Sequence, residues 1–400
     1  MSSHSLSSIV DPTRREFLRK SFASMGWMVA GGALSQCSSS DSGSGAKTSN
    51  IANLGPLQDA DENGVRLPVG FTSRVVARTG ETVEGSSYTW HPSPDGGAVF
   101  VTEDDGYIYV SNSEHAPGGV GAIRFSSDGE IADAYSILDE PTLVNCAGGI
   151  TPWGTWLSCE EVPLGRVYEC DPTGSATAIL RPEMGIFEHE AAAIDEANRH
   201  AYMTEDVPDG RFYRFVYDSD GDLSSGELQV AEVMGDGPEG SVEWRSVEDP
   251  SAETMPTKDQ VPSSTAFDGG EGIWFHEGVV YFSTKGDNRI WAYETDTSVL
   301  SIIYDFATSD TPILSGVDNI TVSPAGDILV AEDGGDMQIV AILPDGSLTP
   351  LLQIVGQDES EITGPAFDPS LQRLYFSSQR GTLGTFEGGI TYEVTGPFFI

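Results

Sequence analysis

Basic side chains are scarce in this chain of 400 residues, which has 20 Lys and Arg against 62 Asp and Glu and a formal net charge of −42. Such a field repels the phosphates of DNA and RNA and the headgroups of anionic membranes, so we expect no nucleic-acid partner. The same field favours cations. Solubility in a salty environment accounts for much of the excess charge, but not for acids that cluster at particular points.

Several common catalytic motifs are absent. The sequence has no G-x-S-x-G elbow, no Walker loop, and no strand–Gly-rich–helix unit for a dinucleotide. Cysteine is also rare, with 4 residues in all. After Cys37, the spacing C-x12-C-x10-C of Cys146, Cys159 and Cys170 does not match a zinc module. An odd number of thiols in an oxidising compartment leaves at least one unpaired or bound as a ligand.

Long hydrophobic runs are missing too. The mainly apolar stretch 22–34 is shorter than the roughly 20 residues that a membrane-spanning helix needs. It follows Arg14-Arg15 and a second basic pair, so residues 1–37 are predicted to be a signal segment read by the twin-arginine translocase. Leu34-Ser35-Gln36-Cys37 resembles a lipoprotein cleavage box, although Gln36 departs from the usual small residue, so a lipid anchor at Cys37 stays open. The protein is then periplasmic or extracellular, with or without that anchor.

Residues 38–64 are predicted to be a flexible linker, because their first part is rich in Ser and Gly. In residues 65–400, short apolar runs alternate with Gly-, Asp-, Asn- and Pro-containing turns, which is typical of an all-β fold. The pattern recurs about every 40–50 residues, a period that indicates propeller blades. The expected units are 88–125, 145–180, 188–234, 270–306, 317–353 and 364–398.

These units predict a six-bladed β-propeller, and five or seven blades stay open. The segment 65–80 would supply a strand to the last blade and close the ring, and residues 235–265 would form an inserted loop. Asp218 to Asp222 resembles part of a calcium loop, but its glycine is misplaced for an EF-hand, so a blade hairpin is favoured.

Acids recur at comparable points of successive units. Because the first strand of each blade lines the central channel of a propeller, these acids can converge on the axis. Carboxylate and amide oxygens suit calcium or magnesium, and a thiolate at Cys146 would point to a transition metal. Taken singly, Cys146 is more often an inert core thiol and His189 a hydrogen-bonded core histidine, so the recurrence carries the prediction. The candidate ligands are Glu114, Cys146, Glu161, Glu190, Glu205, Asp206, Glu271, Asp318, Asn319, Glu332 and Asp333.

Several blocks closely resemble one family, the alkaline phosphatase PhoX family. They are 145–156 (NCAGGITPWGTW), 159–161 (CEE), 189–192 (HEAA), 202–206 (YMTED), 212–216 (FYRFV), 362–367 (ITGPAF) and 375–381 (YFSSQRG). The resemblance covers most of residues 65–400, and the Asn-Cys-Ala-Gly-Gly block is highly specific. The chain resembles a short member of that family.

The resemblance implies a six-bladed propeller with an axial cofactor of ferric iron (Fe3+) and calcium that hydrolyses phosphate monoesters. Carried over by motif, Cys146, Glu161, Glu190 and Glu271 correspond to catalytic iron-centre ligands. The other candidates correspond mostly to calcium ligands: Glu114, Glu205, Asp206, Asp318, Asn319, Glu332 and Asp333. The implied partner is a small phosphate ester, and we expect a monomer.

The sequence also departs from the family pattern. The longer proteins carry Arg-Pro before the glutamate that aligns with Glu271, where this chain has Gly269-Gly270. That arginine is expected to hold the substrate phosphate, and Lys285 or Arg380 could supply the missing charge instead.

Two other functions stay open. One is a calcium-dependent, lactonase-like propeller hydrolase, because residues 317–327 resemble a strand of gluconolactonase-like propellers, which use one divalent cation and no cysteine. The other is a non-catalytic binding propeller with metals as structural staples.

Overall fold

The structure is a computed structural model and describes residues 47–400. The predicted signal segment 1–37, the proposed lipid anchor at Cys37 and the first part of the linker lie outside the described residues. Among residues 47–400, no helix is long and apolar enough to cross a membrane. The described helices are single 3-10 turns: η2 (Ile51–Asn53), η3 (Pro182–Met184), η4 (Thr257–Asp259) and η5 (Gly381–Leu383).

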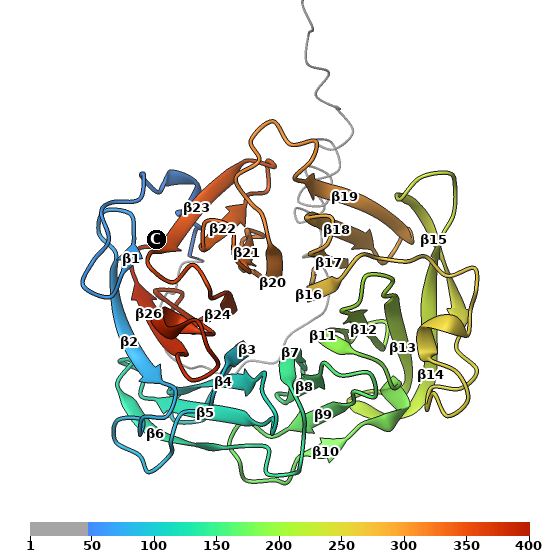
Figure 1. Ribbon diagram of the computed structural model, residues 1–400, viewed down its shortest axis with the longest axis horizontal. Coiled ribbons are helices and arrows are strands. Elements are labelled where there is room, and N and C mark those ends of the chain that lie inside the picture. The colour runs from blue at the N-terminus through green and yellow to red at the C-terminus, as the bar shows by residue number, and fades with distance from the viewer. Residues whose placement is uncertain (1–46) are drawn as a thin grey trace, which may run out of the picture.

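The predicted all-β fold is confirmed, and the strands radiate from a common axis as in a propeller (Figure 1). Two sheets have four consecutive strands each. The first contains β3 (Pro94–Val101), β4 (Tyr107–Ser113), β5 (Val120–Phe125) and β6 (Ile131–Ser136). The second contains β7 (Asn145–Ile150), β8 (Trp156–Glu160), β9 (Val167–Cys170) and β10 (Ile179–Leu180).

The third sheet has nine strands and runs across two of the predicted units. Its strands are, in spatial order, β11 (His189–Asp195), β12 (His200–Glu205), β13 (Phe212–Ser219), β14 (Asp222–Val233), β15 (Gly240–Ser246), β19 (Val299–Asp305), β18 (Arg289–Glu294), β17 (Val279–Thr284) and β16 (Gly270–His276). The hairpin predicted at 218–222 joins β13 to β14, where Ser219 pairs with Asp222.

The last two sheets each recruit a strand from the start of the domain. One contains β20 (Val317–Val322), β21 (Ile328–Glu332), β22 (Gln338–Ile342), β23 (Leu348–Ile354) and β1 (Val65–Arg66). The other contains β24 (Ile362–Phe367), β25 (Arg373–Ser378), β26 (Ile390–Thr395) and β2 (Thr72–Arg78). The expected closure of the ring is therefore made by β2, which pairs with β26, whereas β1 joins the preceding sheet.

Hydrogen bonding among the described residues gives five sheets rather than six separate blades. The difference arises at β15, which lies inside the segment 235–265 that was predicted to be a loop. This strand pairs with β14 on one side and with β19 on the other, and so joins two sets of strands edge to edge. Outer edges with unpaired backbone groups readily accept another strand, which explains the junction.

Part of the predicted linker is packed against the domain. The backbone of Thr48 and Asn50 exchanges hydrogen bonds with Phe398 and Ile400 at the C-terminus. Ile51 is fully buried in a cluster of apolar residues between β20–β23 and β24–β26. Residues 48–51 are thus held by main-chain pairing and by one apolar anchor, which the Ser- and Gly-rich composition upstream did not indicate.

The core consists of clusters between neighbouring sets of strands. Along β4, Tyr107 and Tyr109 face the cluster shared with β24–β26, and Ile108 and Val110 face the cluster shared with β7–β10. Alternate residues of a strand point to opposite faces, so a strand buried on both sides must be apolar at every position. This burial explains the short apolar runs that the sequence repeats.

The innermost strands β3, β7, β11, β16, β20 and β24 contact one another in a closed circle. Each of them departs from regular pairing near its start, at the shifts Pro94/Gly97, Asn145/Gly148, His189/Ala192, Gly270/Ile273, Val317/Ile320 and Thr363/Ala366. A bulge of this kind re-aims the side chain that it contains. The repeated bulge thus brings one side chain per innermost strand toward a common region.

Candidate metal centre

Two positions recur in every set of strands and supply the candidate site. The first is the second residue of each innermost strand, which is Asp95, Cys146, Glu190, Glu271, Asp318 or Thr363. The second is the residue directly after the neighbouring strand, which is Glu114, Glu161, Asp206, Lys285, Asp333 or Gln379. The bulge of each innermost strand and the end of its neighbouring strand therefore each supply one side chain to the site. Most of these residues can carry charge or bind a cation.

Four groups of potential ligand atoms form a continuous series. The groups are Asp95/Glu114/Cys146, Cys146/Glu161/Glu190, Glu190/Glu271/Asp318 and Asp318/Asp333/Glu361, and within each group the ligand atoms lie within 4.8 Å of one another. Neighbouring groups share Cys146, Glu190 or Asp318. We call these nine residues the acid ring.

The residues of the acid ring fit a cation. Glu190 is fully buried, and neither of its carboxylate oxygens has a hydrogen-bond partner in the described part of the chain. An unpaired buried carboxylate is costly, so the arrangement calls for a positive charge at this place. Cys146 contributes the ring's sulfur and is also buried, which suits a softer metal than calcium at that end.

The acids also raise one another's affinity for protons. Burial raises the pKa of Glu190 and Glu271 well above the usual range, and the charges of neighbouring carboxylates add to the effect. Burial, followed by the charges of Glu114 and Asp206, raises the pKa of Glu161 to about 9. Burial likewise raises the pKa of the Cys146 thiol. Bound cations favour the ionised forms and so reverse these shifts.

The predicted residues divide into three sets. Cys146, Glu161, Glu190, Glu271, Glu114, Asp318 and Asp333 lie in the acid ring, and the carboxyl of Asp206 adjoins Glu161. Glu205 and Glu332 instead accept backbone N–H groups of nearby turns: Glu205 from Arg211, and Glu332 from Ser315 and Gln338. Their side chains therefore hold loops in place. The Asn319 amide donates to Asp318 at 2.7 Å, and its oxygen accepts the Gly364 N–H.

Sequence reasoning missed two acids of the ring, Asp95 and Glu361. Asp95 follows Ser93-Pro94 at the start of β3, and Glu361 lies one residue before β24. Gln379 was also missed, although its amide donates to both Asp95 and Glu114. The signal that could have found Asp95 is its place as second residue of an innermost strand, equivalent to Cys146 and Glu190.

Two cationic side chains border the acid ring. The Lys285 ammonium lies 2.7 Å from Glu271 Oε1, 3.4 Å from Asp333 Oδ2 and 3.5 Å from Asp318 Oδ2. The Arg380 guanidinium lies 3.1 Å from Glu361 Oε1, and its side chain is 34% exposed. Both residues named as replacements for the missing arginine thus lie at the site.

The remaining thiols and His189 are part of the packed interior. All three described cysteines are free, and Cys159 and Cys170 are fully buried in apolar clusters and belong to none of the four ligand groups. His189 Nε2 donates to the Gly185 carbonyl at 3.0 Å, and its ring stacks on Phe187. The interpretation of His189 as a hydrogen-bonded core residue is therefore confirmed.

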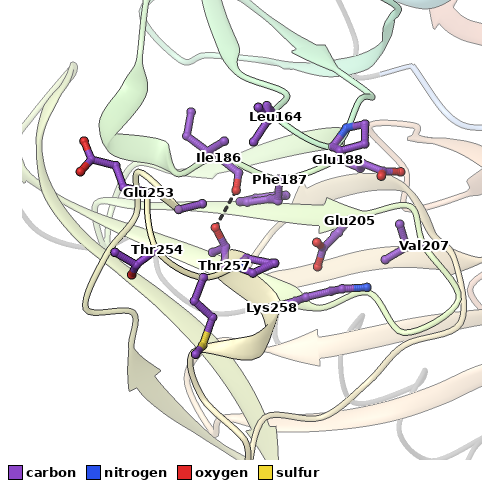
Figure 2. Close-up of a pocket in the computed structure, with 14 residues that line it drawn as sticks. Leu164, Ile186, Phe187, Glu188, Glu205, Val207, Glu253, Thr254, Thr257 and Lys258 are labelled. Carbon is purple, nitrogen blue, oxygen red and sulfur yellow. Dashed lines mark hydrogen bonds between the residues drawn. The ribbon is translucent and has the colours of Figure 1, made fainter.

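A pocket of about 380 Å³ lies beside the start of β11 and the end of β12. Apolar side chains of Leu164, Phe187 and Met255 line it, together with Lys258. Figure 2 shows the loop around Thr257 closing one side of it, where the Thr257 hydroxyl donates to the Ile186 carbonyl at 2.6 Å. Its lining residues Glu188 and Glu205 lie at the strand ends that carry Glu190 and Asp206, and the Asp206 N–H donates to the Glu188 carbonyl.

Comparison with known proteins agrees with this architecture. Residues 116–165 and 163–298 match the family model described as alkaline phosphatase PhoX. Pseudomonas fluorescens PhoX, solved with the transition-state analogue vanadate, is 17% identical with a TM-score of 0.68, and the alignment covers 86% of this chain and 97% of that one.

Other solved structures share less. A protein of unknown function from Bacteroides thetaiotaomicron is 11% identical with a TM-score of 0.52, covering 81% of this chain and 76% of that one. A gluconolactonase from Xanthomonas campestris is 14% identical with a TM-score of 0.47, covering 86% and 98%. No curated protein matches the chain in sequence. By the family match in residues 116–298 and the PhoX-like fold around the acid ring, this part of the chain is similar to the alkaline phosphatase PhoX family.

Proposed function

We propose that this PhoX-like phosphatase hydrolyses phosphate monoesters at a centre of iron and calcium held by the acid ring. The observation that carries the proposal is Glu190, whose two buried oxygens have no partner among the described residues, beside the one thiol of the ring. Bound cations would polarise the phosphoryl oxygens and neutralise the charge that develops during transfer.

The ring divides by ligand chemistry. Cys146, with Glu161 and Glu190, would hold iron, because a thiolate prefers a transition metal. Asp318, Asp333 and Glu361 offer only oxygen atoms and would hold calcium. Glu271 shares a group with Glu190 and Asp318 and would bridge the two kinds of site.

Arg380 is our candidate for binding the substrate phosphate. A guanidinium has five N–H donors in a planar fork that matches phosphate oxygens. The described part of the structure gives the Arg380 fork a single carboxylate partner, Glu361, and leaves the group partly exposed. Lys285 is less suitable, because three carboxylates already surround its ammonium.

The pocket beside the start of β11 and the end of β12 would hold the organic part of the ester. Leu164 and Met255 are exposed apolar side chains at its edge, with 68% and 47% of their surface accessible. Such side chains gain from covering by an apolar group. We therefore expect esters of apolar or aromatic alcohols to be accepted.

We also infer six blades. Six innermost strands repeat one bulge, and six places after the neighbouring strands repeat one side-chain position, although β15 merges two of the blades into one sheet. Export by the twin-arginine translocase, the lipid anchor at Cys37 and a monomeric state stay predictions.

The test uses protein exported by its own route, analysed for metals and assayed with an aryl phosphate. We expect iron and calcium in the purified protein and release of the alcohol. The Cys146→Ser variant should lose iron and at least about 100-fold in kcat/KM, because a hydroxyl is a poor replacement for thiolate. Cys170→Ala, a change in an apolar cluster, is the matched control.

Two results would count against the proposal. A protein that is loaded with metal yet inert toward every phosphomonoester would leave only the binding-propeller alternative. A protein with one divalent cation and no iron, active on a lactone, would support the lactonase-like alternative, which requires no thiol.

A further inference from the structure

The position directly after the second strand of each set carries an acid in four of its six occurrences, Glu114, Glu161, Asp206 and Asp333. Between Asp206 and Asp333 in this series, the same position is Lys285, the first residue after β17. The repeat thus replaces an anion by a cation at one point of the circle. The backbone N–H of Lys285 donates to the Gly269 carbonyl at 2.8 Å, and this hydrogen bond fixes Lys285 at the strand end.

The ammonium of Lys285 occupies the space between acids of two ligand groups. Glu271 belongs to the group with Glu190 and Asp318, and Asp333 belongs to the group with Asp318 and Glu361. The nitrogen lies 2.7, 3.4 and 3.5 Å from oxygens of Glu271, Asp333 and Asp318. Calcium binds oxygen at about 2.3–2.6 Å, so a calcium ion shared by these three carboxylates would need the place that the ammonium holds.

We propose that Lys285 is a built-in cation of the acid ring, which fills by an ammonium a place that would otherwise bind a divalent metal ion. A divalent ion held by the same carboxylates would lie beside the Lys285 ammonium. Two positive charges so close together repel strongly in a half-buried site, so the lysine excludes the ion. The chain then completes its centre with one fewer metal ion than its carboxylates could hold. The inference rests on the proposed cation-binding role of the ring, but not on the reaction.

The experiment counts calcium. Wild type and Lys285→Met are stripped with a chelator, reloaded with Ca2+ alone, desalted and analysed for calcium per chain, with affinities from calorimetry. We expect Lys285→Met to bind about one Ca2+ more than wild type, because three carboxylates lose their ammonium partner. Lys285→Arg, which keeps the charge, and Lys47→Met, an exposed lysine, should match wild type.

Equal calcium content in wild type and Lys285→Met would overturn the inference. Should the single variant fail to fold without its ammonium, Lys285→Met combined with Asp333→Asn decides the matter, since it keeps the net charge of the ring and the group Glu190/Glu271/Asp318. This double variant should also gain about one Ca2+, and an unchanged content there would equally refute the idea. A protein inactive on all phosphomonoesters that still gains the ion would refute the proposed function alone.

Discussion

Single side chains decide what the acid ring can bind. The sulfur of Cys146 is the ring's one soft donor, and Glu190 brings two buried oxygens without protein partners. Lys285 and Arg380 have the same sign of charge but different surroundings, since the first is enclosed by three carboxylates and the second bonds one. Their roles therefore follow from the number of carboxylate partners that each has, and not from the sign of the charge.

Replacing Arg380 by Ala should raise KM for an aryl phosphate by about 10-fold or more, because a hydrogen bond to a charged group contributes about 1.5–3 kcal/mol. Lys at this place should recover part of the loss, since it keeps the charge but not the fork. Steady-state kinetics on metal-replete protein provide the test. Arg124→Ala is the control, because its ion pair with Asp104 is largely exposed and contributes little. An unchanged KM in the Ala variant would remove Arg380 from the phosphate site.

At the scale of elements, glycines allow the innermost strands to approach one another. A Cβ on Gly149 of β7 would lie 1.9 Å from the Ala192 carbonyl oxygen of β11, and one on Gly272 of β16 would lie 2.5 Å from the Ile320 N of β20. Only a residue without a side chain fits such spacing. The ligand positions Cys146 and Glu271 lie on these same strands, so close approach of the backbones also brings the ligands together.

The Gly149→Ala substitution should lower the free energy of unfolding by about 1–3 kcal/mol or more, because the added methyl group overlaps the backbone of β11. Urea unfolding followed by tryptophan fluorescence measures the change. Gly237→Ala is the matched control, since a Cβ there meets no atom within 4 Å. If both variants unfold at the same urea concentration as wild type, the close approach of β7 and β11 does not contribute to the free energy of unfolding.

For the molecule as a whole, histidines outside the acid ring link stability to pH. Burial, followed by the charge of Arg214, lowers the pKa of His200 to about 4, although Asp195 acts in the opposite direction. Burial lowers the pKa of His91 to about 3. In the unfolded chain histidine titrates near 6.5, so between these values the unfolded state binds more protons than the folded state.

The contribution of these histidines to stability should therefore fall as pH decreases from about 6.5 toward 4. His200→Gln should reduce this dependence, because glutamine cannot take up the proton. The measurement compares urea midpoints of wild type and variant at pH 7 and pH 5, at constant calcium. A variant whose midpoint falls between these pH values as much as that of wild type would exclude His200 as a contributor.

The amino-acid sequence determined the all-β class, the positions of the repeated units and most of the acid ring. It could do so because strands buried on both faces must be apolar throughout, and because the departures from that pattern, such as Cys146 and Glu190, stand out. Ring closure by an N-terminal strand was likewise predictable, and β2 provides it.

Only the tertiary structure decided which acids meet. Glu332 and Asp333 are neighbours in sequence, yet one caps a turn and the other joins the ring, because successive side chains at a strand end point in different directions. Glu361 and Lys285 both lie beside Asp318 and Asp333, which are distant from each of them in the chain. Edge pairing through β15 was equally hidden, since a sequence shows which segments can form strands but not which edges are free to pair.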